Sequence, residues 1–183
     1  NNKMVTLLRF VHTVRYLKLK QIFYRAYYLF KKPKINIDRT PILRGVLENW
    51  SAPAYIKSGT SDGKNFKFLG ITETVGSDWN STHLSKLWLY NLHYQNEINA
   101  SENYENFNLC KSLVQQWIDN NPFSYGNGWE PYCISLRVVN WIKWFTRLDE
   151  SAIDPNWITS LAQQIDILEQ KLEYQIMANH LFA

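Results

Sequence analysis

Cysteine, glycine and proline are scarce in this 183-residue sequence, and each scarcity argues against a class of protein. The two cysteines, Cys110 and Cys133, have neither C-x-x-C spacing nor a histidine cluster nearby, which disfavours a disulfide scaffold or a structural zinc site. Seven glycines and six prolines are too few for a turn-dense β-sandwich or a low-complexity chain. We therefore expect two reduced, buried thiols, and neither a metal ion nor a cofactor.

Long apolar runs are also missing. Residues 5–16 are largely apolar, but Arg9, His12 and Arg15 interrupt them, so the uninterrupted stretch of a signal peptide is not present. No window approaches the roughly 20 apolar residues of a membrane-spanning helix. This pattern predicts a cytoplasmic or peripheral-membrane location, or a periplasmic one if a leader preceded residue 1.

Acidic side chains are absent from residues 1–34, which carry nine Lys or Arg. The other residues hold eleven basic and sixteen acidic side chains, so a net charge of +4 combines a +9 arm with a −5 remainder. Such an arm can bind anionic lipid, nucleic acid or an acidic polymer, or it can be a solvated helix face. We expect no nucleic acid partner, because the negative remainder would repel phosphates.

Hydrophobic residues make up 45% of the chain and aromatic residues 15%, enough for one sizeable core. An aromatic excess suits a carbohydrate cleft, although cores also use aromatic side chains. Residues 4–32 predict two short amphipathic helices that end at Pro33, and residues 66–74 predict a strand among turn signals. The chain is thus expected to divide into a basic helical arm (1–34), an irregular connector with short strands (35–85) and a helical region (86–183).

Helical periodicity continues from residue 84 to the end of the chain. It predicts helices over residues 84–99, 103–120 and 131–149, the last with Ile134, Val138 and Ile142 on its buried face. A final long helix starts with Asp154 as N-cap and Pro155 at its first position. Short loops between such helices imply antiparallel hairpins, the unit of bundles, solenoids and closed toroids.

The loop at residues 124–132 contains two glycines and delivers Trp129, Glu130 and Tyr132 just before a helix begins. Loops held by rigid helices are where binding groups concentrate. We therefore treat these three side chains as candidate substrate-binding residues.

The helix after this loop carries a polar and aromatic stripe, in which Arg137, Asn140, Trp141 and Trp144 fall at positions i, i+3, i+4 and i+7. A guanidinium beside an amide and indoles matches an acidic sugar, because Arg binds a carboxylate through two parallel hydrogen bonds. The alternative is that both tryptophans pack against the next helix hairpin while Arg137 pairs with an interior acid.

Asn179 and His180 form a polar pair between apolar residues at the end of the last predicted helix. A lone histidine in such a place is more often a satisfied core residue, and His93 is a weaker candidate of the same kind. The sequence has no phosphate-binding glycine loop, no G-x-S-x-G, no H-E-x-x-H and no dinucleotide fingerprint.

Six runs of sequence are informative when taken together: LYNLHY at 89–94, NNP at 120–122, GNGWEPY at 126–132, SLRVVNWIKW at 135–144, LEY at 172–174 and NHLFA at 179–183. Together they resemble a known family, the N-terminal domain of heparinase II/III-type polysaccharide lyases. The runs VHTVRYLK at 11–18 and QIFYR at 21–25 are similar to leaderless members associated with bacterial surface polysaccharides. The resemblance covers nearly the whole chain.

This resemblance implies a mainly α fold, in which helical hairpins form part of an incomplete (α/α) toroid with an irregular connector near residues 35–85. It also implies cleavage of uronate-containing polysaccharide by β-elimination: a base removes the C5 proton, and the glycosidic oxygen leaves C4 with help from an acid. The uronate carboxylate must be neutralised for that step. Family members place an Asn–His pair there, which Asn179 and His180 match. The other expected substrate contacts are Trp129, Glu130, Tyr132, Arg137, Asn140 and His93.

The family's catalytic tyrosine, its further His or Tyr and its β-sandwich belong to segments that would follow Ala183. The full-length protein is therefore expected to be a lyase, and residues 1–183 alone to be inactive. The expected partner is an acidic polysaccharide or oligosaccharide, with peripheral contact to an anionic membrane as an addition. The alternative is a non-catalytic helical module that binds anionic polysaccharide or a membrane surface through its basic arm.

Overall fold

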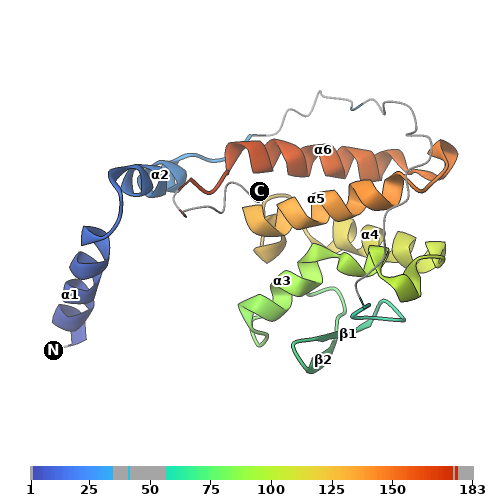
Figure 1. The fold of residues 1–183 in the computed structure, drawn as a ribbon, viewed down its shortest axis with the longest axis horizontal. Coiled ribbons are helices and arrows are strands. Elements are labelled where there is room, and N and C mark those ends of the chain that lie inside the picture. Colours follow the sequence, from blue (N-terminus) through green and yellow to red (C-terminus); the bar gives the residue numbers. More distant parts are fainter. Residues whose placement is uncertain (1, 35–40, 42–56, 175, 177–183) are drawn as a thin grey trace.

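The computed structural model describes residues 2–34, 41, 57–174 and 176, and this part of the chain is mainly helical (Figure 1). Its α-helices are α1 (Asn2–Arg15), α2 (Leu19–Phe30), α3 (Lys86–Tyr94), α4 (Phe107–Asn120), α5 (Pro131–Phe145) and α6 (Pro155–Gln170). Its short 3-10 turns are η1 (Asn96–Asn99), η2 (Ser101–Asn103), η3 (Asn127–Trp129) and η4 (Glu150–Ala152). One antiparallel pair, β1 (Asn65–Phe68) and β2 (Ile71–Thr74), completes the fold. The prediction of a mainly helical protein with a small β element is confirmed.

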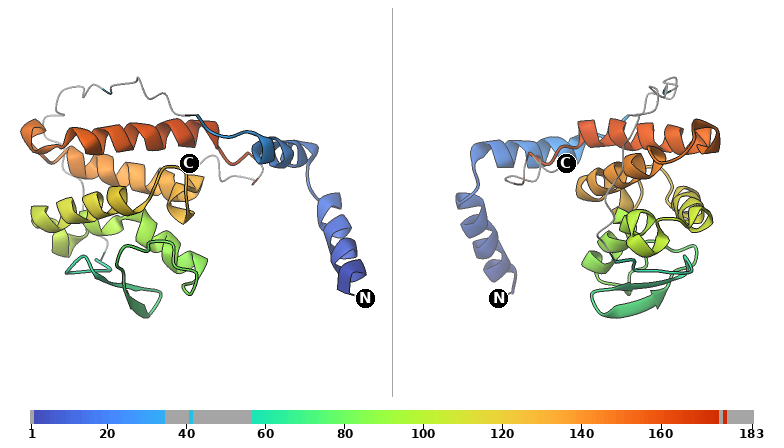
Figure 2. Two further views of the ribbon diagram at one scale, coloured as in Figure 1. Left: turned by 180° about the vertical axis from the view of Figure 1, so that it is seen from behind. Right: turned by 45° about the vertical axis from the view of Figure 1, so that its right-hand side comes forward.

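The helices of the body, which we define as residues 57–174, form two neighbouring rows. Helix α5 contacts both α3 and α6, and α4 contacts α6. Figures 1 and 2 show α6 along one side of the body, α5 beneath it, and the β1–β2 hairpin at the far side, next to α3. In the part of the chain described here, no helix is long and apolar enough to cross a membrane.

The single strand predicted over residues 66–74 is wrong, because the chain reverses in the middle of that segment. Leu69 and Gly70 have φ values of 55° and 79°, the pair of positive angles that a tight hairpin turn of the I′ kind requires. The hairpin is anchored by Phe66, which is buried with its ring 6.2 Å from that of Trp79. The hairpin therefore belongs to the core of the body.

The helix predicted over residues 84–99 stops five residues early. Gln95 adopts a left-handed conformation with φ 52°, and its buried side chain donates to the carbonyl of Leu113 at 2.8 Å and accepts from Trp141 Nε1 at 2.6 Å. These bonds fix the reversal that ends α3. The helix predicted from residue 103 likewise begins later, because Asn106 caps α4 by accepting from the backbone N–H of Leu109.

The start of the last helix is confirmed: Asp154 is the N-cap, accepts from the backbone N–H of Asn156 at 2.8 Å, and is followed by Pro155. Helix α6 ends at Gln170, and Leu172 lies after the helix. Helix α5 ends at Phe145 rather than at residue 149.

Tryptophan dominates the core. Six indoles are almost completely buried: Trp79, Trp88, Trp117, Trp141, Trp144 and Trp157. Ile134 and Val138 are buried as predicted, but Ile142 is 42% exposed because Trp141 and Trp144 occupy the inward side of α5 at that level. The Trp144 ring lies 5.3 Å from that of Trp157 on α6, so the packing alternative for this stripe is the one observed.

Both cysteines are buried free thiols, as expected. Burial raises the pKa of Cys110 to about 11 and that of Cys133 to about 12. Because the thiolate is the reactive form, neither residue is a nucleophile near neutral pH.

Glu97, in η1, is a buried acid with only 4% of its surface exposed. Burial raises its pKa from 4.5 to about 7, although the backbone N–H groups of Gly59 and of Glu97 itself oppose the change. Above pH 4.5 the unfolded chain releases this proton while the folded chain holds it until about pH 7. Stability supplied by the protonated group is therefore lost as pH rises through this window.

We expect the substitution Glu97→Gln to remove this loss of folding stability at higher pH, because glutamine does not ionise. The pKa of Glu97 rises by about 2.5 between the unfolded and the folded chain, which corresponds to about 3 kcal/mol in the free energy of unfolding. Urea unfolding at pH 5 and pH 8 should show that the variant gains about that much relative to the wild type at the higher pH. The exposed Glu105→Gln serves as control. An identical pH dependence for wild type and Glu97→Gln would contradict the assignment.

Candidate functional site

The N-terminal end of α5 carries a group of phenol, carboxylate and amine side chains, which we call the Glu130 cluster: Lys86, Tyr90, Tyr94, Glu130 and Tyr132. Glu130 occupies the N-cap position and is followed by Pro131, whose ring is compatible with the first turn of a helix. The carboxylate accepts a hydrogen bond from the Tyr90 hydroxyl, and its other oxygen lies 2.9 Å from Lys86 Nζ. The ring of Tyr132 lies 5.9 Å from that of Tyr94.

The electrostatics of the cluster favour the protonated form of two of its phenols, Tyr90 and Tyr94. Burial and the hydrogen bond to Glu130 raise the pKa of Tyr90 well above its usual value, and burial raises that of Tyr94. Burial lowers the pKa of the neighbouring Lys171, while the charge of Glu130 opposes that change. The cluster therefore offers neutral hydroxyl groups together with the amine of Lys86, whose side chain is 63% exposed, and Lys171 lies beside it as a second amine.

The structure brings two of the predicted binding residues, Glu130 and Tyr132, to a partly exposed surface. Trp129, Arg137, Asn140 and His93 are instead buried, with at most 7% of each exposed. Asn179 and His180 lie outside the described residues.

Arg137 is a fully buried side chain of the core, and three hydrogen bonds hold its guanidinium. Its guanidinium donates to Gln164 Oε1 at 2.8 Å, to the carbonyl of His93 at 3.0 Å and to the carbonyl of Gly128 at 2.8 Å. It also lies over the ring of Trp117, 3.7 Å from the centroid. Burial lowers its pKa to about 9, which leaves it charged at neutral pH. Its hydrogen-bond partners are neutral groups, not the interior acid that was the alternative, and we leave Arg137 out of the proposed site.

His93 is buried beside Arg137. Burial, followed by the charge of Arg137, lowers its pKa to about 3, so the imidazole is neutral near pH 7. Its Nδ1 accepts from Trp117 Nε1 at 3.2 Å, which places the proton on Nε2. The backbone of Gly128 approaches so closely that a Cβ there would lie 2.7 Å from Nδ1. The second glycine of the predicted loop is thus explained by packing against His93.

Asn140 and Trp129 also have protein partners. The Asn140 amide donates to the carbonyl of Tyr94 at 2.9 Å and to Asn96 Oδ1 at 2.8 Å, which joins α5 to the end of α3. Trp129 Nε1 donates to the carbonyl of Asn121 at 3.3 Å. In the described fold these side chains hold the helices and the loop together.

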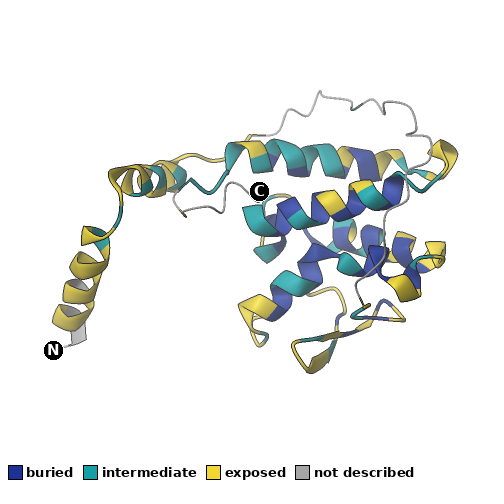
Figure 3. Cartoon of the chain, viewed as in Figure 1, coloured by how far each residue is buried: buried dark blue, intermediate teal, exposed yellow. Residues whose placement is uncertain are grey.

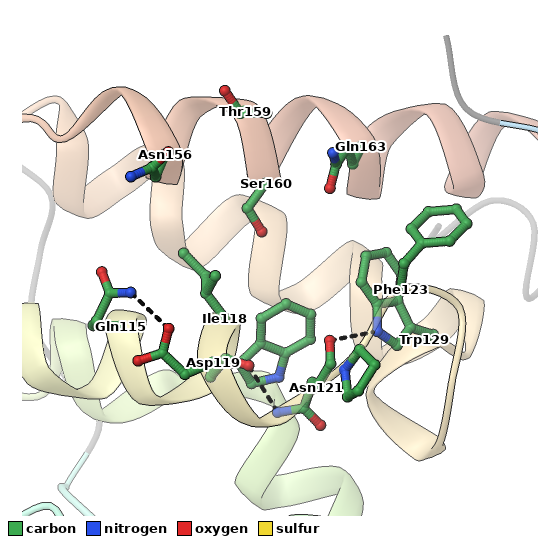
Figure 4. A pocket seen from close by; sticks show the side chains of 12 residues that line it. Gln115, Ile118, Asp119, Asn121, Phe123, Trp129, Asn156, Thr159, Ser160 and Gln163 are labelled. Carbon is green, nitrogen blue, oxygen red and sulfur yellow. Dashed lines mark hydrogen bonds between the residues drawn. The ribbon is translucent and has the colours of Figure 1, made fainter. Parts of the chain in front are cut away.

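A pocket of about 360 Å³ opens between α4 and α6, beside the loop before η3 (Figure 4). Amides, hydroxyls and aromatic rings predominate among its lining residues: Gln115, Trp117, Ile118, Asp119, Asn121, Pro122, Phe123, Trp129, Asn156, Thr159, Ser160 and Gln163. This pocket was not predicted from the sequence, because its polar residues come from the solvent-facing sides of two helices, whereas the sequence pattern indicates only the buried faces. The NNP run at residues 120–122 borders it, and Trp129, one of the predicted binding residues, lines it.

Some of the polar side chains that line this pocket have hydrogen-bonding capacity left for a ligand. Within the described residues, the side-chain amides of Asn156 and Gln163 form no hydrogen bond, and the Ser160 hydroxyl accepts from Gln164 at 3.3 Å and keeps its own proton to donate. Phe123 stands at the rim, 41% exposed, with its ring 5.2 Å from that of Trp129. Asp119 is the one acid in the lining, and no Lys or Arg contributes to it.

The pocket and the Glu130 cluster lie on either side of η3, since Trp129 lines the first and the adjacent Glu130 belongs to the second. Within the described residues, no group of three or more His, Cys, Asp or Glu side chains could hold a metal ion. No protein-family model, curated protein or solved structure matches the chain.

Proposed function

We propose that this chain binds polysaccharide and forms the N-terminal part of a lyase of the heparinase II/III type, which cleaves uronate-containing polysaccharide by β-elimination. The observation that carries the proposal is the pocket between α4 and α6, with its polar lining, in which Asp119 is the one charged residue, and its exposed aromatic rim. The resemblance of the sequence to that family supplies the reaction.

The chemistry of the pocket fits the hydroxyl groups of a sugar ring. Amides and hydroxyls can both donate and accept, as sugar hydroxyls do, and Asn156 and Gln163 have this capacity unused within the described chain. Phe123 offers an aromatic surface to the apolar side of a ring. The volume of about 360 Å³ lies within the range of small-ligand sites. A lining without Lys or Arg favours an uncharged unit of the polymer in this pocket.

The Glu130 cluster fits the charged part of such a polymer. Lys86 and Lys171 carry the positive charges that a uronate carboxylate requires, and the Tyr90 and Tyr132 hydroxyls are hydrogen-bonding groups. Segment 171–174 borders the cluster, since the charges of Lys171 and Glu130 affect each other, and Asn179 follows Tyr174 by five residues in the sequence. Asn179 and His180 would neutralise the carboxylate during proton removal at C5.

The helix arrangement is consistent with the proposed toroid. In an (α/α) toroid, consecutive helix hairpins stack side by side, which places alternate helices in the same row. The contacts of α3 with α5 and of α4 with α6 follow this order. We propose that the hairpins of the body form the first part of such a ring.

Pocket variants test the carbohydrate proposal. Titration calorimetry of the 183-residue chain with uncharged and uronate-containing oligosaccharides should detect binding, and Phe123→Ala and Gln163→Ala should each weaken it about 10-fold. A lost ring contact or hydrogen bond of about 1.4 kcal/mol gives this factor. Tyr125→Ala is the matched control, because Tyr125 is 65% exposed in the same loop but does not line the pocket. Binding that both variants retain would place the ligand elsewhere, and absence of any saccharide binding would contradict the proposal.

A further inference from the structure

We infer that residues 2–34 are a membrane-binding arm, in which α1 and α2 lie on the surface of a bilayer that contains anionic lipid. The inference is independent of the proposed lyase function, because it concerns a surface outside the pocket and the Glu130 cluster. It depends on three observations: each helix has an exposed apolar face, all the charged side chains of the arm are positive, and the arm is attached to the body through the opposite face of α2.

Helix α2 presents its apolar face to solvent. At 100° per residue, Leu19, Phe23 and Phe30 fall within about 40° of one another around the helix. They are 85%, 62% and 85% exposed, and Leu29 nearby is 82% exposed. A soluble helix normally turns such a face inward. In α2 this apolar face is exposed, so it is available to bind a partner.

The opposite face of α2 is the one attached to the body. Tyr28 donates a hydrogen bond to the carbonyl of Leu172, and the Tyr24 ring lies 5.0 Å from that of Tyr174. Beyond the helix, the side-chain amide of Gln170 donates to the carbonyl of Lys34 at 2.7 Å and its oxygen accepts from the Lys34 N–H at 2.9 Å. These contacts hold α2 against the end of α6 in an orientation that leaves the apolar face outward.

Helix α1 repeats the pattern and extends away from the body (Figures 1 and 2). Met4, Leu8 and Val11 follow the i, i+4, i+7 spacing of one face and are 62%, 62% and 58% exposed. Phe10 adds an aromatic ring that is 65% exposed. Figure 3 shows α1 and α2 as mostly exposed, in contrast to the buried interior of the body.

The charge of the arm selects an anionic partner. Residues 1–34 contain nine Lys or Arg and no acid. Eight of these side chains are exposed in the structure: Arg9, Arg15, Lys18, Lys20, Arg25, Lys31, Lys32 and Lys34. Around α2, Lys20 and Arg25 flank the apolar face on its two sides, where long side chains can reach lipid headgroups while the apolar residues enter the acyl boundary.

A bilayer fits this surface better than a second copy of the arm does. Two arms in contact would bring nine positive charges against nine, without an acidic side chain between them. A polyanion would satisfy the charge but would leave the apolar faces of α1 and α2 in water. Anionic lipid satisfies both, which is the combination that interfacial amphipathic helices use.

Co-sedimentation with lipid vesicles tests this inference. The 183-residue chain should bind vesicles of phosphatidylcholine and phosphatidylserine, bind phosphatidylcholine alone much more weakly, and dissociate as salt is raised. Combining Arg9→Gln, Arg15→Gln, Lys20→Gln and Arg25→Gln should weaken binding to the anionic vesicles by at least about 100-fold. Combining Leu19→Ser, Phe23→Ser and Phe30→Ser should weaken it to a similar degree.

Matched controls alter the same kinds of residue on the body. The charge control combines four exposed lysine changes, Lys57→Gln, Lys64→Gln, Lys67→Gln and Lys111→Gln. The apolar control combines Leu69→Ser, Ile71→Ser and Leu87→Ser, at residues that are 57%, 49% and 57% exposed. Both controls should bind vesicles within about twofold of the wild type.

Three results would overturn the inference. The first is vesicle binding that survives in both arm variants or is equal with and without phosphatidylserine. The second is tight binding to heparin or duplex DNA by a chain that leaves anionic vesicles unbound. The third is concentration-dependent dimerisation in analytical ultracentrifugation that the apolar arm variant abolishes, again without vesicle binding.

Discussion

Replacing Arg137 by alanine is expected to lower the free energy of unfolding by about 4 kcal/mol. The change leaves acceptors on Gln164, His93 and Gly128 without their donor and opens a cavity beside Trp117. An unmade buried hydrogen bond costs about 1 to 3 kcal/mol, and a large-to-small core substitution adds a cavity cost of similar size. Urea unfolding followed by circular dichroism measures the difference.

Two further variants make this result specific. Arg137→Lys keeps the charge but loses the planar fork that reaches three acceptors, so it should fall between alanine and the wild type. The exposed Arg9→Ala should change stability by less than about 0.5 kcal/mol. If Arg137→Ala were as stable as the wild type and instead lost saccharide binding, Arg137 would be a ligand-binding residue, as the sequence pattern suggested.

Local signals predicted much of the fold. The start of α6 at Asp154 and Pro155 was predicted correctly, because an N-cap and a first-turn proline act within a few residues. The burial of Cys110 and Cys133 was also predicted correctly. The end of α3 was not, because the side chain of Gln95 is held by Leu113 and Trp141, which are distant in sequence.

The candidate site was harder to predict, because α5 is buried on more than one side. A stripe of Arg137, Asn140 and tryptophans has the composition of a sugar-binding surface, and also that of a polar network within an aromatic core. The distinction depends on Gln164, 27 residues away, which accepts from Arg137 inside the protein. Periodicity within one helix contains no information about that partner.

For Glu130 and Tyr132 the position in the helix distinguishes a surface location from a buried one. They sit at the start of α5, where Glu130 contacts Tyr90 and Lys86 from α3 and the ring of Tyr132 lies 5.9 Å from that of Tyr94. The pocket between α4 and α6 depends on how two helices pack, so it could be found only from the structure.

We propose above that this sequence belongs to an enzyme that cleaves uronate-containing polysaccharide by β-elimination. The direct measurement is the absorbance of the unsaturated uronate product, made with the gene product that carries this sequence and a panel of acidic polysaccharides. We expect product formation by the wild type and a loss of at least about 100-fold in each of Asn179→Ala and His180→Ala, because the carboxylate is then no longer neutralised. The exposed His83→Ala is the matched control and should keep its activity. A near-normal rate in either Asn179→Ala or His180→Ala, or a wild type that forms no unsaturated product from any polysaccharide of the panel, would contradict the claim.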